Sequence, residues 1–191
     1  MMIEIIHRVN HIDELNEISN KYGIEVDIRG FKKKLILAHD LHEKGDNFKE
    51  YIDSYEHKLL VANIKESGIE EQVIGELLKK NISNFFLLDV EFPYILQNFE
   101  KHGENLCLRF SKHEGIDTIK NFIGKVKWIW VDTYEDFDLD SKIAAVLSNF
   151  SLCLVSPSRW GFNNQTNHYI NKFESFDLSF DAIMIDRDEA S

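Results

Sequence analysis

The sequence contains little cysteine and no recognisable cysteine motif. Among its 191 residues only Cys107 and Cys153 are cysteines, and no CxxC pair or zinc-ligand spacing occurs. This excludes a disulfide-rich scaffold and a structural zinc site. Each cysteine lies inside a short apolar LCL run, so we expect two buried, reduced thiols.

Long apolar runs and basic residues are also scarce. No stretch approaches the roughly 20 apolar residues of a membrane span, and Glu4 interrupts the opening run MMIEIIHRV too early for a secretory signal. We therefore expect a cytoplasmic protein without a membrane span. Lys and Arg number 22 against 33 Asp and Glu, which gives a net charge of -11. Such a surface repels nucleic acid and anionic membranes, although a local basic pocket for a small anion stays compatible with it.

Apolar residues, in contrast, are sufficient for one sizeable core. Hydrophobic residues make up 43% and aromatic residues 12%, and the length suits a single domain over residues 1–191. Apolar runs of four to eight residues recur along the chain, as is typical of buried parallel strands. These runs are residues 3–7, 23–29, 58–65, 84–89, 106–110, 127–132, 151–156 and 181–186.

Segments with helical spacing separate these runs, for example residues 11–22, 69–80 and 93–103. Strands alternating with helices predict an α/β protein, and eight strands predict a compact (β/α)8 barrel of the TIM type, with parallel strands and without a final helix. Residues 33–40 form an extra run that predicts a hairpin with the second run. An open doubly wound sheet is the alternative fold. Neither GxGxxG nor GxxxxGK[ST] follows any run, which excludes the two commonest nucleotide-binding loops.

Polar residues end the runs, at the edge where the active sites of parallel barrels lie. His7 and Arg8 end the first run, and His39 ends the extra run. Later runs also finish in polar residues, and for the acids and the serine a solvated strand end explains them at least as well as a function. These later strand ends are Asp89, Arg109, Asp132, Ser156 and Asp186.

The second and third runs carry a candidate metal site. Glu25 and Asp27 lie two residues apart, so both side chains lie on one face of the strand. Two carboxylates on one face of a buried strand repel each other unless a cation lies between them. Hard divalent cations take oxygen ligands, and the third run supplies the amide oxygen of Asn63. The pattern therefore predicts a Mg2+ or Ca2+ site formed by Glu25, Asp27 and Asn63.

Histidines and cations complete the predicted constellation. His7 and His39 on neighbouring strands can act as base and acid at neutral pH. Arg8 and Lys65 can hold an anionic oxygen and neutralise developing charge. Carboxylates, two histidines and two cations together indicate a site that cleaves a phosphate ester.

The order of these motifs resembles the glycerophosphodiester phosphodiesterases, which belong to the phosphatidylinositol-specific phospholipase C-like phosphodiesterases. The matching pieces are IIHR at residues 5–8, IEVDIR at 24–29, LILAHD at 35–40 and ANIKESG at 62–68. The resemblance implies a metal-assisted hydrolase of lipid metabolism that cleaves a small glycerol- or sugar-linked phosphodiester. In this chain Val9 stands where the family usually has glycine.

The resemblance also implies roles for single residues. His7 and His39 would be the general acid/base pair, and Arg8 and Lys65 would bind the phosphate. Glu25 and Asp27 would bind the metal, which the family completes with a third acid. Here Asn63 stands at that position, and an amide in place of a carboxylate removes one negative charge from the site.

Further substrate contacts are expected from later strand ends and loops. Phosphate sites in barrels often use the loops after the last two strands, so Arg159 and Trp160 join Arg109 as candidates. Trp128 and Trp130 share one face of a strand and predict interior packing or a pocket wall.

Two other functions stay open on the sequence. The departures at Val9 and Asn63 are compatible with a weak or inactive barrel that binds a phosphorylated ligand or scaffolds a biosynthetic complex. Alternatively, Lys65 could form a Schiff base in a lyase. The neighbouring acids Glu25 and Asp27 argue against this, because they favour the charged lysine.

Overall fold

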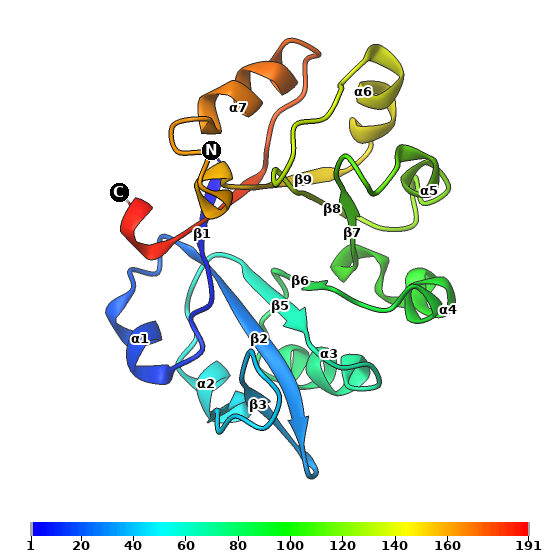
Figure 1. Ribbon diagram of the computed structural model, residues 1–191. Helices are drawn as coiled ribbons and strands as arrows, with labels where there is room; N and C mark the ends of the chain where they lie inside the picture. The colour runs from blue at the N-terminus through cyan, green and yellow to red at the C-terminus, as the bar shows by residue number, and fades with distance from the viewer. Residues whose placement is uncertain (1, 191) are drawn as a thin grey trace.

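The computed structural model describes residues 2–190, in which ten strands alternate with seven α-helices (Figure 1). The strands are β1 (Ile3–Ile6), β2 (Gly23–Phe31), β3 (Lys34–Leu37), β4 (Asp46–Asn47), β5 (Leu60–Ile64), β6 (Phe85–Leu88), β7 (Cys107–Phe110), β8 (Trp128–Val131), β9 (Ser151–Val155) and β10 (Ala182–Ile185). The α-helices are α1 (Ile12–Glu17), α2 (Phe48–Asp53), α3 (Glu70–Lys79), α4 (Phe92–His102), α5 (Ile116–Lys120), α6 (Ser141–Leu147) and α7 (Thr166–Glu174). Three short 3-10 helices are η1 (Gly103–Asn105), η2 (Pro157–Trp160) and η3 (Arg187–Glu189).

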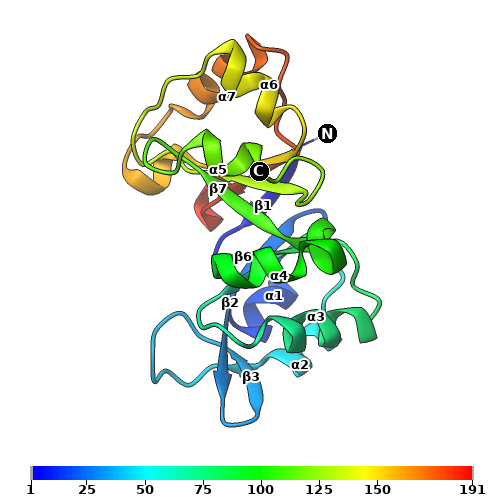
Figure 2. The ribbon, with the colours of Figure 1, turned by 90° about the vertical axis from the view of Figure 1, so that its right-hand side faces the viewer.

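All ten strands belong to one curved sheet. In one direction from β1, the neighbours are β10, β9, β8 and β7, and in the other they are β2, β5 and β6, all in parallel pairs. Hairpin strands β3 and β4 extend from β2, and Figure 2 shows this hairpin projecting away from the rest of the sheet. The hairpin predicted for residues 33–40 is thereby confirmed.

The prediction of a closed, all-parallel (β/α)8 barrel was wrong. The sheet is mixed, because β3 runs antiparallel to both β2 and β4. The ladder also does not close, since only an isolated bridge between Leu87 and Leu106 connects the β6 and β7 segments. At this seam the side-chain amide of Asn105 donates to the Phe85 carbonyl over 2.8 Å. A side chain therefore occupies a backbone acceptor of β6 that would otherwise be free for a strand partner.

The helices follow local sequence signals, but α1 is shorter than the pattern predicts. Pro93 lies in the first turn of α4, and Gly103 caps its end. Helix α1 ends at Glu17, and the backbone becomes extended at the next residue, Ile18, so α1 covers only part of the expected helix over residues 11–22. No helix among residues 2–190 is long and apolar enough to span a membrane.

Two apolar clusters pack on the two faces of the sheet. The larger cluster fills the space between the strands and the helices. The smaller cluster lies on the inner, concave face and contains Trp128, Trp130, Cys107 and Cys153. Trp128 stacks on Phe86 with ring centroids 4.7 Å apart, so the predicted interior packing of this strand is confirmed. Both cysteines are buried free thiols, and burial raises the pKa of each.

Candidate active site

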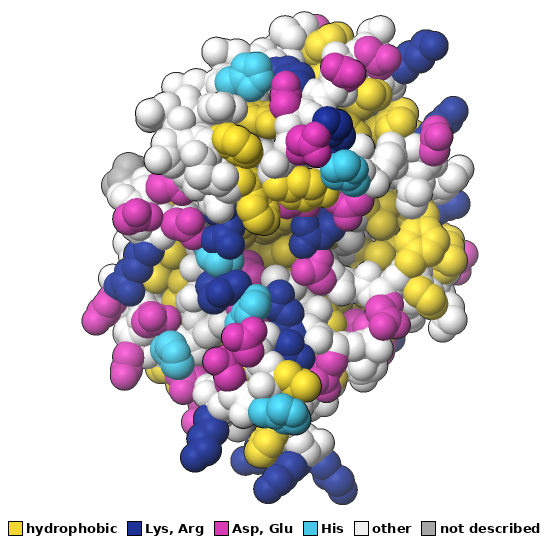
Figure 3. Space-filling view, in the orientation of Figure 1, with side chains coloured by type: hydrophobic (Ala, Val, Ile, Leu, Met, Phe, Trp, Pro, Cys, Tyr) yellow, Lys and Arg dark blue, Asp and Glu magenta, His cyan; other side chains and the backbone are white. Residues whose placement is uncertain are grey.

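Polar side chains meet in a cavity at the carboxyl ends of the parallel strands. The cavity has a volume of about 150 Å³. In Figure 3, Lys, Arg and His side chains gather with acidic ones near the middle of the face that Figure 1 shows. The cavity is lined by His7, Arg8, Glu25, Asn63, Lys65, Leu88, Asp89, Arg109, Trp130, Asp132, Val155, Arg159, Trp160 and Met184.

The turn after β1 brings its backbone to the Glu25 carboxylate. Arg8 has φ of 54°, in the left-handed region that residues other than glycine seldom adopt. In this conformation the Arg8 backbone N–H donates to Glu25 Oε2 over 2.7 Å. The other oxygen, Oε1, accepts from Asn63 Nδ2 over 2.9 Å. Burial, and then the charge of Asp27, raise the pKa of Glu25.

Asp27 lies behind the cavity wall and is almost completely buried, with 1% of its surface exposed. Its Oδ1 lies 3.1 Å from Lys65 Nζ. Its Oδ2 accepts from Asn10 Nδ2 over 2.9 Å and lies 3.5 Å from Arg8 Nε. Asn10 also accepts from the Asp27 backbone N–H over 2.9 Å. A buried carboxylate is thus matched by two cations and an amide.

Asn63 connects β5, on which it lies, to β2 through its side chain. In the register of β2 and β5 it is the partner of Asp27. Its Nδ2 donates to Glu25, whereas its Oδ1 is buried and has no hydrogen-bond partner among the described residues. Buried oxygens without partners are uncommon and call for a donor that the chain does not supply.

His7 is held by groups from the far end of the chain. Arg159 NH1, from η2, lies 2.6 Å from His7 Nδ1 and 2.7 Å from Asp186 Oδ1. The same Nδ1 lies 3.2 Å from Asp186 Oδ1, so a donor and an acceptor both face it, and Nε2 lies 3.9 Å from Glu25 Oε2. Burial and then the charges of Arg159 and Arg8 lower the pKa of His7 to about 3.

Arg109 forms the opposite wall between two acids. Its Nε donates to Asp89 Oδ1 over 2.8 Å, and its NH1 pairs with Asp132. Asp89 has φ of 59°, so two left-handed residues, Arg8 and Asp89, line the same cavity. Burial raises the pKa of Asp132 to about 6, although Arg109 opposes this shift.

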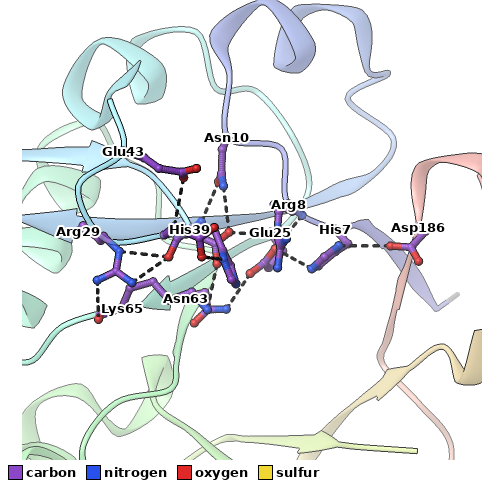
Figure 4. A network of polar contacts seen from close by, with 12 residues as sticks. His7, Arg8, Asn10, Glu25, Arg29, His39, Glu43, Asn63, Lys65 and Asp186 are labelled. Atoms are coloured by element: carbon purple, nitrogen blue, oxygen red, sulfur yellow. Dashed lines mark hydrogen bonds and ion pairs between the residues drawn. The ribbon is translucent and has the colours of Figure 1, made fainter. Parts of the chain in front are cut away.

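His39 belongs to the same polar network, on the side away from Asp186 and near Arg29 (Figure 4). Its Nδ1 lies 2.7 Å from Asp40 Oδ1, and the guanidinium of Arg29 donates to its backbone carbonyl over 2.8 Å from NH2. Arg29 also donates to the Lys65 carbonyl over 3.2 Å, which connects the hairpin to the end of β5. Unlike His7, His39 is not among the residues that line the cavity.

The structure therefore brings most of the predicted site residues together in the lining of one cavity and places two of them outside this lining. All of the predicted residues line the cavity except Asp27, which lies behind its wall, and His39, which lies on the neighbouring hairpin. Asn10 was missed as a contributor, because it has no motif that distinguishes it from an ordinary loop residue, and Asp186 was noted only as a strand end. Asp89 and Asp132 were noted only as strand ends, and the strand-end position was the sole available signal.

The predicted metal ligands do not fit a divalent cation in this arrangement. Each oxygen of Glu25 and Asp27 already faces a nitrogen that carries hydrogen. Within residues 2–190, no three His, Cys, Asp or Glu side chains are grouped so that they could hold a metal ion. Metal binding by these residues stays a prediction, which titration with a divalent cation tests.

Comparisons with known proteins support the fold. No protein-family model and no curated protein sequence matches the chain. Among solved structures, the chain is similar to a glycerophosphodiester phosphodiesterase from Agrobacterium tumefaciens str. C58, with a TM-score of 0.68. The alignment covers 98% of this chain and 97% of that chain at 12% sequence identity. At this identity the similarity shows that the two chains share a fold, over nearly their full lengths.

Proposed function

We propose that this protein is a phosphodiesterase that acts on a small glycerol- or sugar-linked phosphodiester. The observation that carries the proposal is the convergence of Arg8, Lys65, Arg109 and Arg159 on one cavity that also contains His7. Each of these cations is paired with an acid in the structure, namely Asp27, Asp89, Asp132 or Asp186, so a bound phosphate would share them with these carboxylates. Arginine and lysine are the side chains that bind phosphate oxygens.

The volume of the cavity indicates which part of a substrate it can enclose. About 150 Å³ corresponds to about five water molecules, at roughly 30 Å³ each. Such a space holds a phosphoryl group with part of a small alcohol, and the rest of a larger substrate would lie outside it. The fold similarity to a glycerophosphodiester phosphodiesterase supports the same class of substrate.

Phosphate binding would prepare His7 for proton transfer. Besides burial, the cations Arg159, Arg8 and Lys65 lower the pKa of His7. An anion bound between these cations offsets their charges, so the pKa of His7 should rise when substrate binds. Protonated His7 then gives a proton to the leaving alkoxide.

His39 is the proposed base. The Asp40 carboxylate can only accept a hydrogen bond, so its contact with Nδ1 leaves Nε2 of neutral His39 as the free acceptor. This nitrogen would take the proton of the nucleophile, which is water or a hydroxyl of the substrate. A hydroxyl nucleophile gives a cyclic phosphate as the first product.

A panel of glycerophosphodiesters tests this function. Purified protein is incubated with each diester, and release of the free alcohol is measured for the wild type, His7→Ala and the matched control His168→Ala on α7. We expect turnover by the wild type and the control, with a rate about 10²–10⁴-fold lower for His7→Ala. Unchanged turnover in His7→Ala would refute the assignment.

A second candidate function is binding of a phosphorylated ligand without catalysis. The observation that favours it is the position of His39 outside the cavity lining. In this case glycerol 3-phosphate binds in calorimetry, but no diester on the panel is cleaved. A Schiff-base lyase is not proposed, because Asp27 lies 3.1 Å from Lys65 Nζ and favours the protonated amine.

A further inference from the structure

Protein N–H groups contact the carboxylates of Glu25 and Asp27 at the centre of the site. The Glu25 oxygens lie 2.7 and 2.9 Å from their donors, the Arg8 backbone nitrogen and Asn63 Nδ2. The Asp27 oxygens lie 3.1 and 2.9 Å from Lys65 Nζ and Asn10 Nδ2. One lone pair of each oxygen is thereby used, and a divalent cation would have to take the second lone pair beside the positive end of an N–H bond.

The local charge leads to the same conclusion. The Asp27 carboxylate has two cationic neighbours, Lys65 at 3.1 Å and Arg8 at 3.5 Å. The Lys65 side chain is 17% exposed and that of Asp27 1%, so water screens this pair only weakly. A Mg2+ or Ca2+ ion would add two positive charges beside these cations. Hard cations bind through several negatively charged oxygens, and Asn63 adds a neutral amide here.

The amide of Asn63 is the feature of the site that most disfavours a metal ion. It lies beside Asp27 in the register of β5 with β2, and its side chain is directed at Glu25 through Nδ2. A carboxylate at this position could not donate to Glu25 and would leave three acids together. The amide instead donates a hydrogen bond to Glu25 and keeps Oδ1 unpartnered within the cavity wall.

We propose that this site binds its anionic ligand without a divalent cation. The Lys65 ammonium group and the Asn63 amide hold the carboxylate pair where a metal ion would otherwise lie, and Asn63 is the residue that determines this. The nature of the ligand rests on the proposed function, whereas the absence of metal binding does not depend on turnover.

Titration with Mn2+ tests the metal directly, because the electron paramagnetic resonance signal of free Mn2+ is lost when the ion binds. We compare the wild type with Asn63→Asp and with Asn121→Asp, a control that adds the same charge at an exposed position after α5. We expect no saturable binding by the wild type or the control below about 1 mM, and binding at least about tenfold tighter by Asn63→Asp. Circular dichroism establishes that each variant is folded.

Saturable binding of Mn2+ by the wild type below about 1 mM would overturn the proposal. A folded Asn63→Asp variant that binds no more tightly than the wild type would overturn the role of Asn63. If Asn63→Asp does not fold, the wild-type titration still decides the main point.

Calorimetry with inorganic phosphate provides a second test. We expect the same affinity in the presence of EDTA and of added Mg2+, and an affinity at least tenfold lower in Lys65→Met. Loss of phosphate binding on EDTA treatment would overturn the proposal. A protein that binds phosphate without metal but cleaves no diester would contradict the proposed phosphodiesterase and leave this inference intact, so the two failures are distinguishable.

Discussion

Asp132 should make the stability of this protein depend on pH in a direction that surface carboxylates do not. Its side chain is only 4% exposed, and burial raises its pKa from 3.8 to about 6 despite the pairing with Arg109. At 1.36 kcal/mol per pH unit, this difference corresponds to about 3 kcal/mol. The buried carboxylate therefore costs stability whenever it is ionised.

The sign follows from proton binding. Below about pH 3.8 the carboxyl group is protonated in the folded and the unfolded chain, and the contribution of Asp132 to stability is fully present. As pH rises the unfolded chain loses its proton first, so stability falls until pH passes the folded pKa of about 6. The loss between pH 5 and pH 8 is about 1.4 kcal/mol by this linkage.

The test is urea unfolding of wild type and Asp132→Asn at several pH values. The asparagine cannot ionise, so its stability relative to the wild type should increase by about 1.4 kcal/mol from pH 5 to pH 8. Asp138→Asn, at an exposed position of the same loop, controls for loss of one carboxylate. A relative stability of Asp132→Asn that stays constant or falls with pH would refute the reasoning. It would show that the ion pair with Arg109 outweighs burial.

Three further predictions concern other parts of the molecule. Lys65→Met should lower the free energy of unfolding by about 3 kcal/mol at pH 7, since Asp27 loses its nearest cation; urea denaturation measures this, and a loss below 1 kcal/mol would contradict it. Gly103→Ala should destabilise by at least about 2 kcal/mol, because the added Cβ meets the backbone carbonyl of Lys125; a thermal melt within a degree of wild type would show otherwise. His39→Ala should reduce kcat by about 10²–10⁴-fold and change phosphate affinity less than about twofold, because the side chain lies outside the cavity lining; a large loss of affinity would place His39 in the binding site instead.

Much of the fold could be predicted because short apolar runs mark buried strands. The eight predicted runs all contain strands of the sheet, and the predicted hairpin is present. Closure was predicted wrongly, since it depends on whether two neighbouring strands form a ladder. The Asn105 side chain takes a backbone acceptor of β6 at the seam, and no periodicity in the sequence reports such a contact.

Alternation along β2 and the strand-end positions were enough to identify Glu25, Asp27, Asn63, Lys65 and His7 as candidates from the sequence alone. Their pairings could not be predicted in the same way. The contact between Arg159 and His7 joins residues 152 positions apart, and Asn10 reaches Asp27 from a loop outside any apolar run.

The sequence by itself determined which residue types stand at the ends of the strands, because strand geometry has a fixed period of two and strands end where polar residues begin. Only the tertiary structure decided what each of these side chains faces. The first strand pairs with the last in the middle of the sheet, which brings Arg159 and Asp186 to His7. The same packing directs a donor to every oxygen of Glu25 and Asp27. Two carboxylates that suggest a metal in the sequence are therefore held by the protein's own amides and cations in the fold.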